Sequence, residues 1–304
     1  MATNLQKHLH STSSPPLHYT NRTMSRGASL SDLGAIPHPS AASLADSADV
    51  IFLSLADDAA LAATVDALRL AFDLAGKVVV DTSTVHPAAS AAAAARLAER
   101  GADFVAAPVF GASPVAAEGR LLFVVAGEDA VVEEAVVPYV VGVMGRAVLR
   151  VGEDVRMAGV MKTAGNFVTA GMMELISEAH VFAEKTGLGS EAMEALLEQQ
   201  YGPLAFNMSK RLTTGAYMPA KGERPWSSLE LALKDVGHGI KCAAESGTKL
   251  EVGEVALRHL QEAKQFSDTQ GRPLDSSSMF GVLRQQAGLP FETNQVQQRD
   301  AGDK

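Results

Sequence analysis

The chain of 304 residues has few of the residues that build disulfide, metal or membrane structures. Its one cysteine, Cys242, excludes a disulfide framework and a zinc site built from cysteines. No apolar run approaches the roughly 20 residues that a membrane-spanning helix requires. The histidines, among them His180, His238 and His259, are scattered along expected helices, so we expect core or surface roles for them and no metal site.

Positive charge is also scarce. Lysine and arginine number 26 against 35 acidic residues, which gives a net charge of -9. Nucleic-acid binding requires a basic stripe, so we expect no nucleic-acid partner, and we expect no membrane partner. The first twenty or so residues lack the basic and apolar regions of a signal peptide. We therefore expect a cytoplasmic protein, with a mitochondrial location left open.

What the first half does contain is an alternation of short apolar runs and alanine-rich stretches. Continuous runs rich in β-branched residues predict strands that are buried on both faces. Alternation of such strands with helices predicts an α/β fold with a doubly wound, mostly parallel sheet. The predicted strands cover residues 50–55, 77–83, 103–109 and 121–127, and the predicted helices cover residues 58–70, 87–100 and 129–139.

The segment DTSTVHP, residues 81–87, follows the second of these strands. Ser83 or Thr84 could cap the next helix, with Pro87 in its first turn. Ligands of doubly wound sheets bind beyond the carboxyl ends of the strands, so the same hydroxyl groups could instead face a ligand. Both interpretations remain open from the residues alone.

A long helix is predicted over residues 159–187. It is apolar on most faces, which indicates burial between two masses of protein. Lys162 and Asn166 lie four residues apart, on one face, and Gly159 allows a close approach to the backbone there. A buried lysine requires a partner or a function, and burial suits it to proton transfer. The alternative is a structural lysine that extends its ammonium to solvent.

The rest of the chain is predicted to be helical, over residues 190–199, 227–246, 248–266 and 276–287. Lys234 and Asp235 lie in the middle of the second of these helices. We expect an α/β domain at residues 1–151, an all-helical domain at residues 152–290 and a disordered tail at residues 291–304.

Four motifs in this order resemble those of the β-hydroxyacid dehydrogenase family. This family includes 3-hydroxyisobutyrate dehydrogenase and the glyoxylate and succinic semialdehyde reductases, and it is related to 6-phosphogluconate dehydrogenase. The motifs are DTSTVHP, APVFGASPVAAEGRL, GVMKTAGN and LKDVGHG. The resemblance implies a Rossmann-type domain followed by an all-α domain, and hydride transfer between a nicotinamide cofactor and a small hydroxy acid or its aldehyde or keto form.

The resemblance also implies roles for individual residues. Lys162 becomes the catalytic acid or base, and Asn166 orients it and the substrate. Two positions depart from the family pattern, because Phe110 replaces a serine and Ala112 replaces a glycine. The implied substrate-binding residues are Phe110, Gly111, Ala112, Lys234 and Asp235, and the implied cofactor-binding residues include Leu55, Ala56, Ser83, Thr84 and Lys234.

The beginning of the chain is similar to the region that follows the family's first strand. HYTNRT, residues 18–23, resembles the second strand and its turn, in which Asn21, Arg22 and Thr23 would bind a 2′-phosphate. NADP(H) is therefore the expected cofactor, with NAD(H) possible. The first strand and its glycine-rich phosphate turn have no counterpart in these residues, so we expect a truncated cofactor site and weak or absent dinucleotide binding.

Two other functions remain as alternatives. The chain could be a non-catalytic binding or dimerisation protein that has lost the family's cofactor site, or it could resemble the imine reductases. Retention of Lys162 and Asn166 favours the dehydrogenase. We expect a small carboxylate-bearing substrate as its partner, and the apolar helical half indicates a homo-oligomer.

Overall fold

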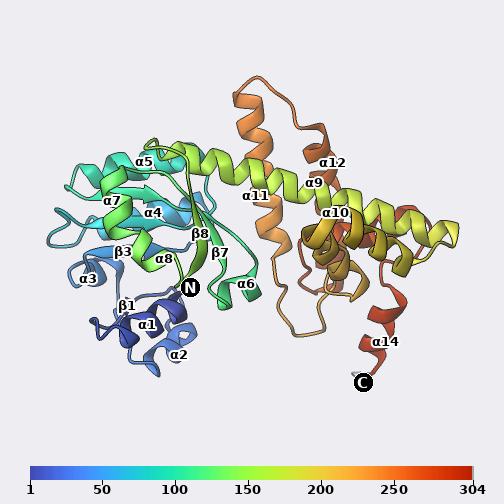
Figure 1. Ribbon diagram of the computed structural model, residues 1–304, viewed down its shortest axis with the longest axis horizontal. Coiled ribbons are helices and arrows are strands. Elements are labelled where there is room, and N and C mark those ends of the chain that lie inside the picture. The colour runs from blue at the N-terminus through green and yellow to red at the C-terminus, as the bar shows by residue number, and fades with distance from the viewer. Residues whose placement is uncertain (303–304) are drawn as a thin grey trace. The chain divides into compact units, whose positions relative to one another are not determined.

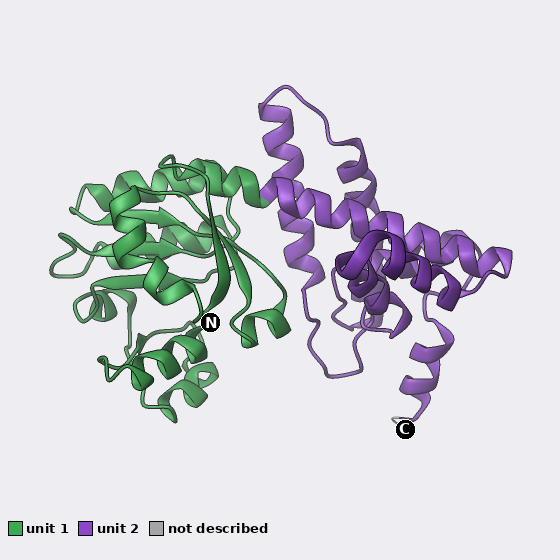
Figure 2. Ribbon diagram, viewed as in Figure 1, with its two compact units in different colours: residues 1–162 green, residues 163–304 purple. Residues whose placement is uncertain are grey.

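The computed structural model describes residues 1–302 and divides the chain into two compact units, Met1–Lys162 and Thr163–Lys304 (Figure 2). The boundary falls after residue 162, inside the long helix α9 (Arg156–Thr186), whereas the sequence predicts a domain boundary after residue 151. α9 therefore contributes its first turns to one unit and the rest of its length to the other.

The first unit is built on short, mostly parallel strands. One sheet has the order β3-β4-β5, all parallel, and another has the order β6-β7-β8, in which β6 is antiparallel to β7. A bridge between Ala106 and Ala126 connects the two sheets. The strands are β3 (Val50–Leu53), β4 (Val78–Asp81), β5 (Asp103–Ala106), β6 (Val109–Phe110), β7 (Leu121–Val125) and β8 (Gly145–Arg150).

Helices cover both faces of these strands (Figure 1). All four residues of β4 are buried; Val79 packs in one hydrophobic core, whereas Val78 and Val80 pack in the other. This arrangement confirms the predicted α/β fold and explains why the strand lacks polar alternation. The helices are α1 (Ala2–Ser11), α2 (Ala28–Ser31), α3 (Ala41–Ala45), α4 (Asp58–Leu68), α5 (Pro87–Ala98), α6 (Ser113–Ala117), α7 (Asp129–Ala135) and α8 (Val137–Val140), with a 3₁₀ turn at Met24–Gly27.

The first strands of the unit form a sheet of their own. β1 (His18–Tyr19) and β2 (Ile36–Pro37) are parallel partners, and α1 precedes them. β1 lies at the start of the segment that resembles the family's second strand. Among residues 1–302, neither strand pairs with β3. The parallel sheet is therefore split between β1 and β3.

The second unit is helical throughout its described residues. Besides most of α9 it contains α10 (Ser190–Thr213), α11 (Leu229–Glu245), α12 (Glu251–Gln270), α13 (Met279–Gln286) and α14 (Asn294–Gly302). α10 runs past the predicted end at residue 199. The helix is interrupted at Gly202, whose φ of 77° is not helical, and Pro203 begins a second helical stretch that brings Leu212 into the core.

The described part of the tail expected to be disordered, residues 291–302, contains helix α14 and packs against the core. Phe291 is 1% exposed and its ring stacks on Phe266 at 3.8 Å between centroids. The Tyr217 hydroxyl donates a hydrogen bond to the Phe291 carbonyl, and Asp300 of α14 pairs with Arg272. The polar composition concealed one aromatic anchor, which is enough to hold the segment against the core.

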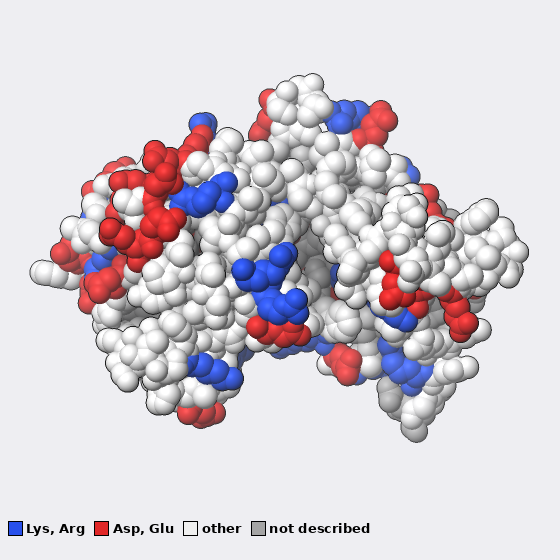
Figure 3. All heavy atoms as spheres, in the orientation of Figure 1, with Lys and Arg blue, Asp and Glu red and all other residues white. Residues whose placement is uncertain are grey.

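Acidic side chains gather over α7 on the face that Figure 3 shows. Glu128, Asp129, Glu133 and Glu134 are all exposed there. Every helix within residues 1–302 is too short or too polar to cross a membrane.

Candidate active site

A small hollow lies in the first unit, where the loops after β4 and β5 meet the first turns of α9. Loops at the carboxyl ends of parallel strands form ligand sites in folds of this type. The predicted residues Lys162 and Ser83 both line the hollow. Its lining residues are Asp81, Ser83, Val85, Ser90, Ala106, Pro108, Gly159 and Lys162.

Lys162 is 7% exposed, which argues against a lysine that extends its ammonium to solvent. Its Nζ atom lies 4.1 Å from the centroid of the Phe110 ring, at the end of β6. Gly159 precedes it by one turn, and a Cβ atom at this position would lie 3.3 Å from the Cα atom of Pro87. The predicted close approach at Gly159 is therefore confirmed, and it brings the start of α9 against the start of α5.

The loop of residues 81–87 does more than cap a helix. The Ser83 hydroxyl accepts a hydrogen bond of 2.8 Å from the amide of Leu55, which joins two of the predicted cofactor loops. The helix cap expected at Ser83 or Thr84 is instead His86, whose Nδ1 accepts from the amide of Ala88 at 3.3 Å. The prediction of a serine or threonine cap was wrong because those residues precede the helix by too many positions to reach its amides.

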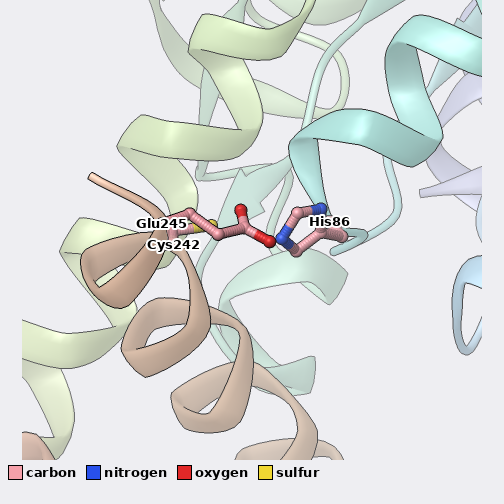
Figure 4. A group of neighbouring side chains, drawn as sticks. All are labelled: His86, Cys242 and Glu245. Carbon is pink, nitrogen blue, oxygen red and sulfur yellow. The ribbon is translucent and has the colours of Figure 1, made fainter. Parts of the chain in front are cut away.

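Two residues of this loop were not among the predicted site residues. Asp81 is 1% exposed and its Oδ1 accepts a hydrogen bond from the amide of Ser83 at 3.0 Å. His86 is buried at the first turn of α5 (Figure 4), and its amide donates to Oδ1 of Asp58. Their place in the DTSTVHP motif was the available signal, but the burial of both side chains is visible only in the structure.

The loop expected to bind a 2′-phosphate follows β1. Asn21, Arg22 and Thr23 are exposed, and the Asn21 amide donates to the sulfur of Met24. Close by in the fold, Nδ1 of His18 lies 2.6 Å from Nε2 of His38. Burial lowers the pKa of His18, and the neighbouring His38 lowers it further. No sequence signal points to this pair, because parallel strands bring residues twenty positions apart together.

Gly111 and Ala112, the expected substrate-binding residues beside Phe110, form the turn between β6 and α6. Gly111 has a φ of +134°, which disfavours every other residue. A Cβ atom there would lie 2.6 Å from Cδ2 of Leu121. Ala112 is half-buried and is the N-cap residue of α6.

Three predicted residues meet in the second unit. The Asn166 side-chain amide donates to Oδ2 of Asp235 at 2.8 Å, and Lys234 Nζ lies 2.7 Å from Oδ1 of the same carboxylate. Asn166 follows Lys162 by one turn of α9. Asp235 therefore positions both Asn166 and Lys234.

Two further polar residues lie on α11, beyond Lys234 and Asp235. Cys242 and Glu245 are three residues apart on one face of this helix (Figure 4). Burial raises the pKa of the Cys242 thiol, although a hydrogen bond with Thr163 opposes the shift. A thiol with a raised pKa is a poor nucleophile, so Cys242 is not a candidate for covalent catalysis.

A parallel sheet with polar loops at its carboxyl ends, followed by a helix with a buried lysine, is the arrangement expected of a nucleotide-dependent oxidoreductase. Comparison with known proteins supports this class. Residues 1–152 match the model of the NAD-binding domain of 6-phosphogluconate dehydrogenase, and residues 157–283 match that of the NAD-binding domain of NADP-dependent 3-hydroxyisobutyrate dehydrogenase. The chain belongs to the β-hydroxyacid dehydrogenase family and is an NAD(P)-dependent oxidoreductase.

Individual relatives agree. The chain is 32% identical to the NADH-dependent oxidoreductase ucdB of Aspergillus ustus, over 91% of this chain and 93% of that protein. It is 28% identical to glyoxylate/succinic semialdehyde reductase 1 of Arabidopsis thaliana, over 81% and 89% of the two chains. The crystal structure of 3-hydroxyisobutyrate dehydrogenase from Salmonella typhimurium shares the fold, with a TM-score of 0.77, 19% identity and coverage of 92% and 95%.

Proposed function

We propose that the protein reversibly interconverts a small hydroxy acid and its aldehyde or keto form, with Lys162 as the catalytic acid or base. The observation that carries this proposal is the buried ammonium of Lys162 in a hollow at the strand ends. A bound nicotinamide supplies or accepts the hydride. Lys162 donates a proton to the carbonyl oxygen in reduction and removes it from the hydroxyl in oxidation.

The neighbouring residues have supporting roles in this proposal. Asn166 orients Lys162 and the substrate from the next turn of α9, and Asp235 holds Asn166 through the hydrogen bond described above. The amides of Gly111 and Ala112 bind the substrate carboxylate, and Lys234 contributes a positive charge.

The division of the chain into an α/β domain and a helical domain at residue 151 stays a prediction.

The residues that would hold the cofactor fit it in part. Leu55 and Ser83 are joined by a hydrogen bond at the strand ends, with Ala56 and Thr84 beside them, where the nicotinamide half would bind. Arg22, with Asn21 and Thr23, favours NADP(H), because an arginine there pairs with a 2′-phosphate. NAD(H) remains the alternative, and the relative from Aspergillus ustus is named for NADH dependence.

The partner in assembly that we propose is a second copy of this chain. Val168, Leu175 and Phe182 are spaced by seven residues along α9, and their exposed fractions are 54%, 67% and 62%. Such a row of large apolar side chains is typical of a helix that packs against another helix. A two-fold axis would pack the row of one copy against the same row of the second copy, so both rows would be buried in one interface.

The experiment that tests the catalytic proposal measures carbonyl reduction with glyoxylate and succinic semialdehyde, and oxidation of 3-hydroxyisobutyrate, with NADPH and NADH side by side. Lys162→Met should lower kcat about a hundredfold or more, because a general acid contributes about that much. Lys221→Met, which changes an exposed loop lysine, should leave kcat unchanged. We expect the KM for NADPH to be lower than the KM for NADH.

Different outcomes separate the functions. If Lys162→Met retains the parent kcat, the assigned role of Lys162 is wrong. If the parent chain turns over none of these substrates and the fluorescence of neither NADPH nor NADH changes on titration, the proposed reaction is wrong for this chain and the expected loss of dinucleotide binding holds.

A further inference from the structure

The structure places an aromatic ring against the lysine that the proposed function requires. Lys162 Nζ lies 4.1 Å from the Phe110 ring centroid, well within the range of a cation–π interaction. The lysine is 7% exposed, so its ammonium has lost much of its hydration. The negative face of a ring compensates for part of that loss only while the ammonium stays over it.

Both partners of this contact are held by backbone structure. Phe110 lies on β6, where it is paired with Leu122 of β7, and the unusual backbone of Gly111 follows it directly. Lys162 follows Gly159, which packs against Pro87. The ring and the base of the lysine side chain therefore have little freedom, so the contact restricts where Nζ can lie.

The ring also contacts one of the hydrophobic cores at its edge, and Phe110 is half-buried. A packing role would require bulk at this position, which leucine or methionine supplies almost as well as phenylalanine. A role toward Lys162 requires an aromatic face. The two roles therefore differ in what they predict for aliphatic and aromatic replacements.

We propose that Phe110 is a positioning residue, which holds the Lys162 ammonium at the point from which it donates its proton. This inference rests on the proposed function of Lys162. The phenyl ring itself takes no part in proton transfer. Its contribution is to limit the positions of Nζ to those above the ring, so that fewer orientations are unproductive.

Turnover provides the first test, with Phe110→Leu and Phe110→Met against Phe110→Tyr. Each aliphatic variant should lower kcat about tenfold and leave the KM of the cofactor unchanged, whereas Phe110→Tyr should stay within about twofold of the parent. The solvent deuterium isotope effect on kcat should rise in Phe110→Leu, because proton donation becomes slower, and should stay at the parent value in Phe110→Tyr. Parent kcat and isotope effect in both aliphatic variants would overturn the proposal.

A second test requires no turnover. In protein labelled with ¹³C at the lysine Cε atoms, the signal absent from Lys162→Met belongs to Lys162. The ring current of Phe110 should shift its Hε protons upfield in the parent and in Phe110→Tyr, and the shift should vanish in Phe110→Leu. An unshifted parent signal would also overturn the inference.

The two proposals fail separately. If Lys162→Met keeps the parent kcat, the proposed function fails, whatever the spectra show. If Lys162→Met loses kcat but the aliphatic variants at Phe110 do not, only the positioning role fails. Urea unfolding of each variant shows whether it is folded. If Phe110→Leu is unfolded, the NMR signal of Lys162 in Phe110→Met replaces it in the comparison.

Discussion

At the scale of single residues, the candidate site depends on two glycines at which an added side chain would be crowded or strained. Gly159 lets α9 approach Pro87, and Gly111 turns the chain directly after Phe110. Lys162 itself could be placed on its helix from the sequence, but its ring contact could not. The two residues of that contact lie far apart in the chain, so only folding determines their distance.

Gly111→Ala provides a prediction at this scale. The substitution should lower the free energy of unfolding by about 1–3 kcal/mol. The backbone φ of +134° disfavours alanine, and the new Cβ atom would lie 2.6 Å from the Leu121 side chain. Gly142→Ala is the matched control, because its φ is +78° and no atom lies within 4 Å of the added Cβ. That control should lose about 1 kcal/mol from backbone strain alone.

Urea unfolding of both variants measures these losses. An equal loss in the two variants would mean that the contact with Leu121 relaxes freely and that only the backbone matters at Gly111.

At the scale of elements, most helices and strands follow the apolar pattern of the sequence. The strands β3, β4 and β7 and the helices α4, α5 and α9 all lie within or across the predicted ranges. The exceptions arise where one distant contact decides the conformation. His86, and not Ser83 or Thr84, caps the N-terminus of α5. Helix α14 forms in a segment whose composition predicts disorder.

The Phe291 anchor allows a prediction about that last segment. Phe291→Ala should lower the free energy of unfolding by about 3–5 kcal/mol, because the ring is 1% exposed and stacked on Phe266. Gln295→Ala, at an exposed position of α14, should change it by less than about 0.5 kcal/mol. Chemical denaturation followed by circular dichroism measures both changes. A loss below about 1 kcal/mol in Phe291→Ala, which is the size of an ordinary point mutation, would show that Phe291 does not anchor the segment.

At the scale of the whole molecule, the chain consists of two units with α9 continuous through their boundary. The family relationship spans both, since one family model matches residues 1–152 and the other residues 157–283. The exposed apolar row on α9 belongs to this scale, because a monomer leaves it in water.

The proposed assembly predicts that a charge on the row will disrupt it. Leu175→Glu should weaken self-association at least about a hundredfold, because the interface would bury an unpaired carboxylate. Gln261→Glu adds the same charge at an exposed position of α12 and should leave association unchanged. Sedimentation velocity over a range of concentrations measures both, and a parent chain that stays monomeric throughout would refute the assembly.

The sequence alone determined the fold class, the family and the lysine proposed as catalytic, because strand and helix periodicity and short motifs are local properties of a chain. Tertiary structure decided the rest. It set the ring of Phe110 against Lys162, joined Leu55 to Ser83 and seated Phe291 in the helical core. Each of these contacts joins residues that are distant in sequence, and their geometry depends on packing that no local pattern encodes.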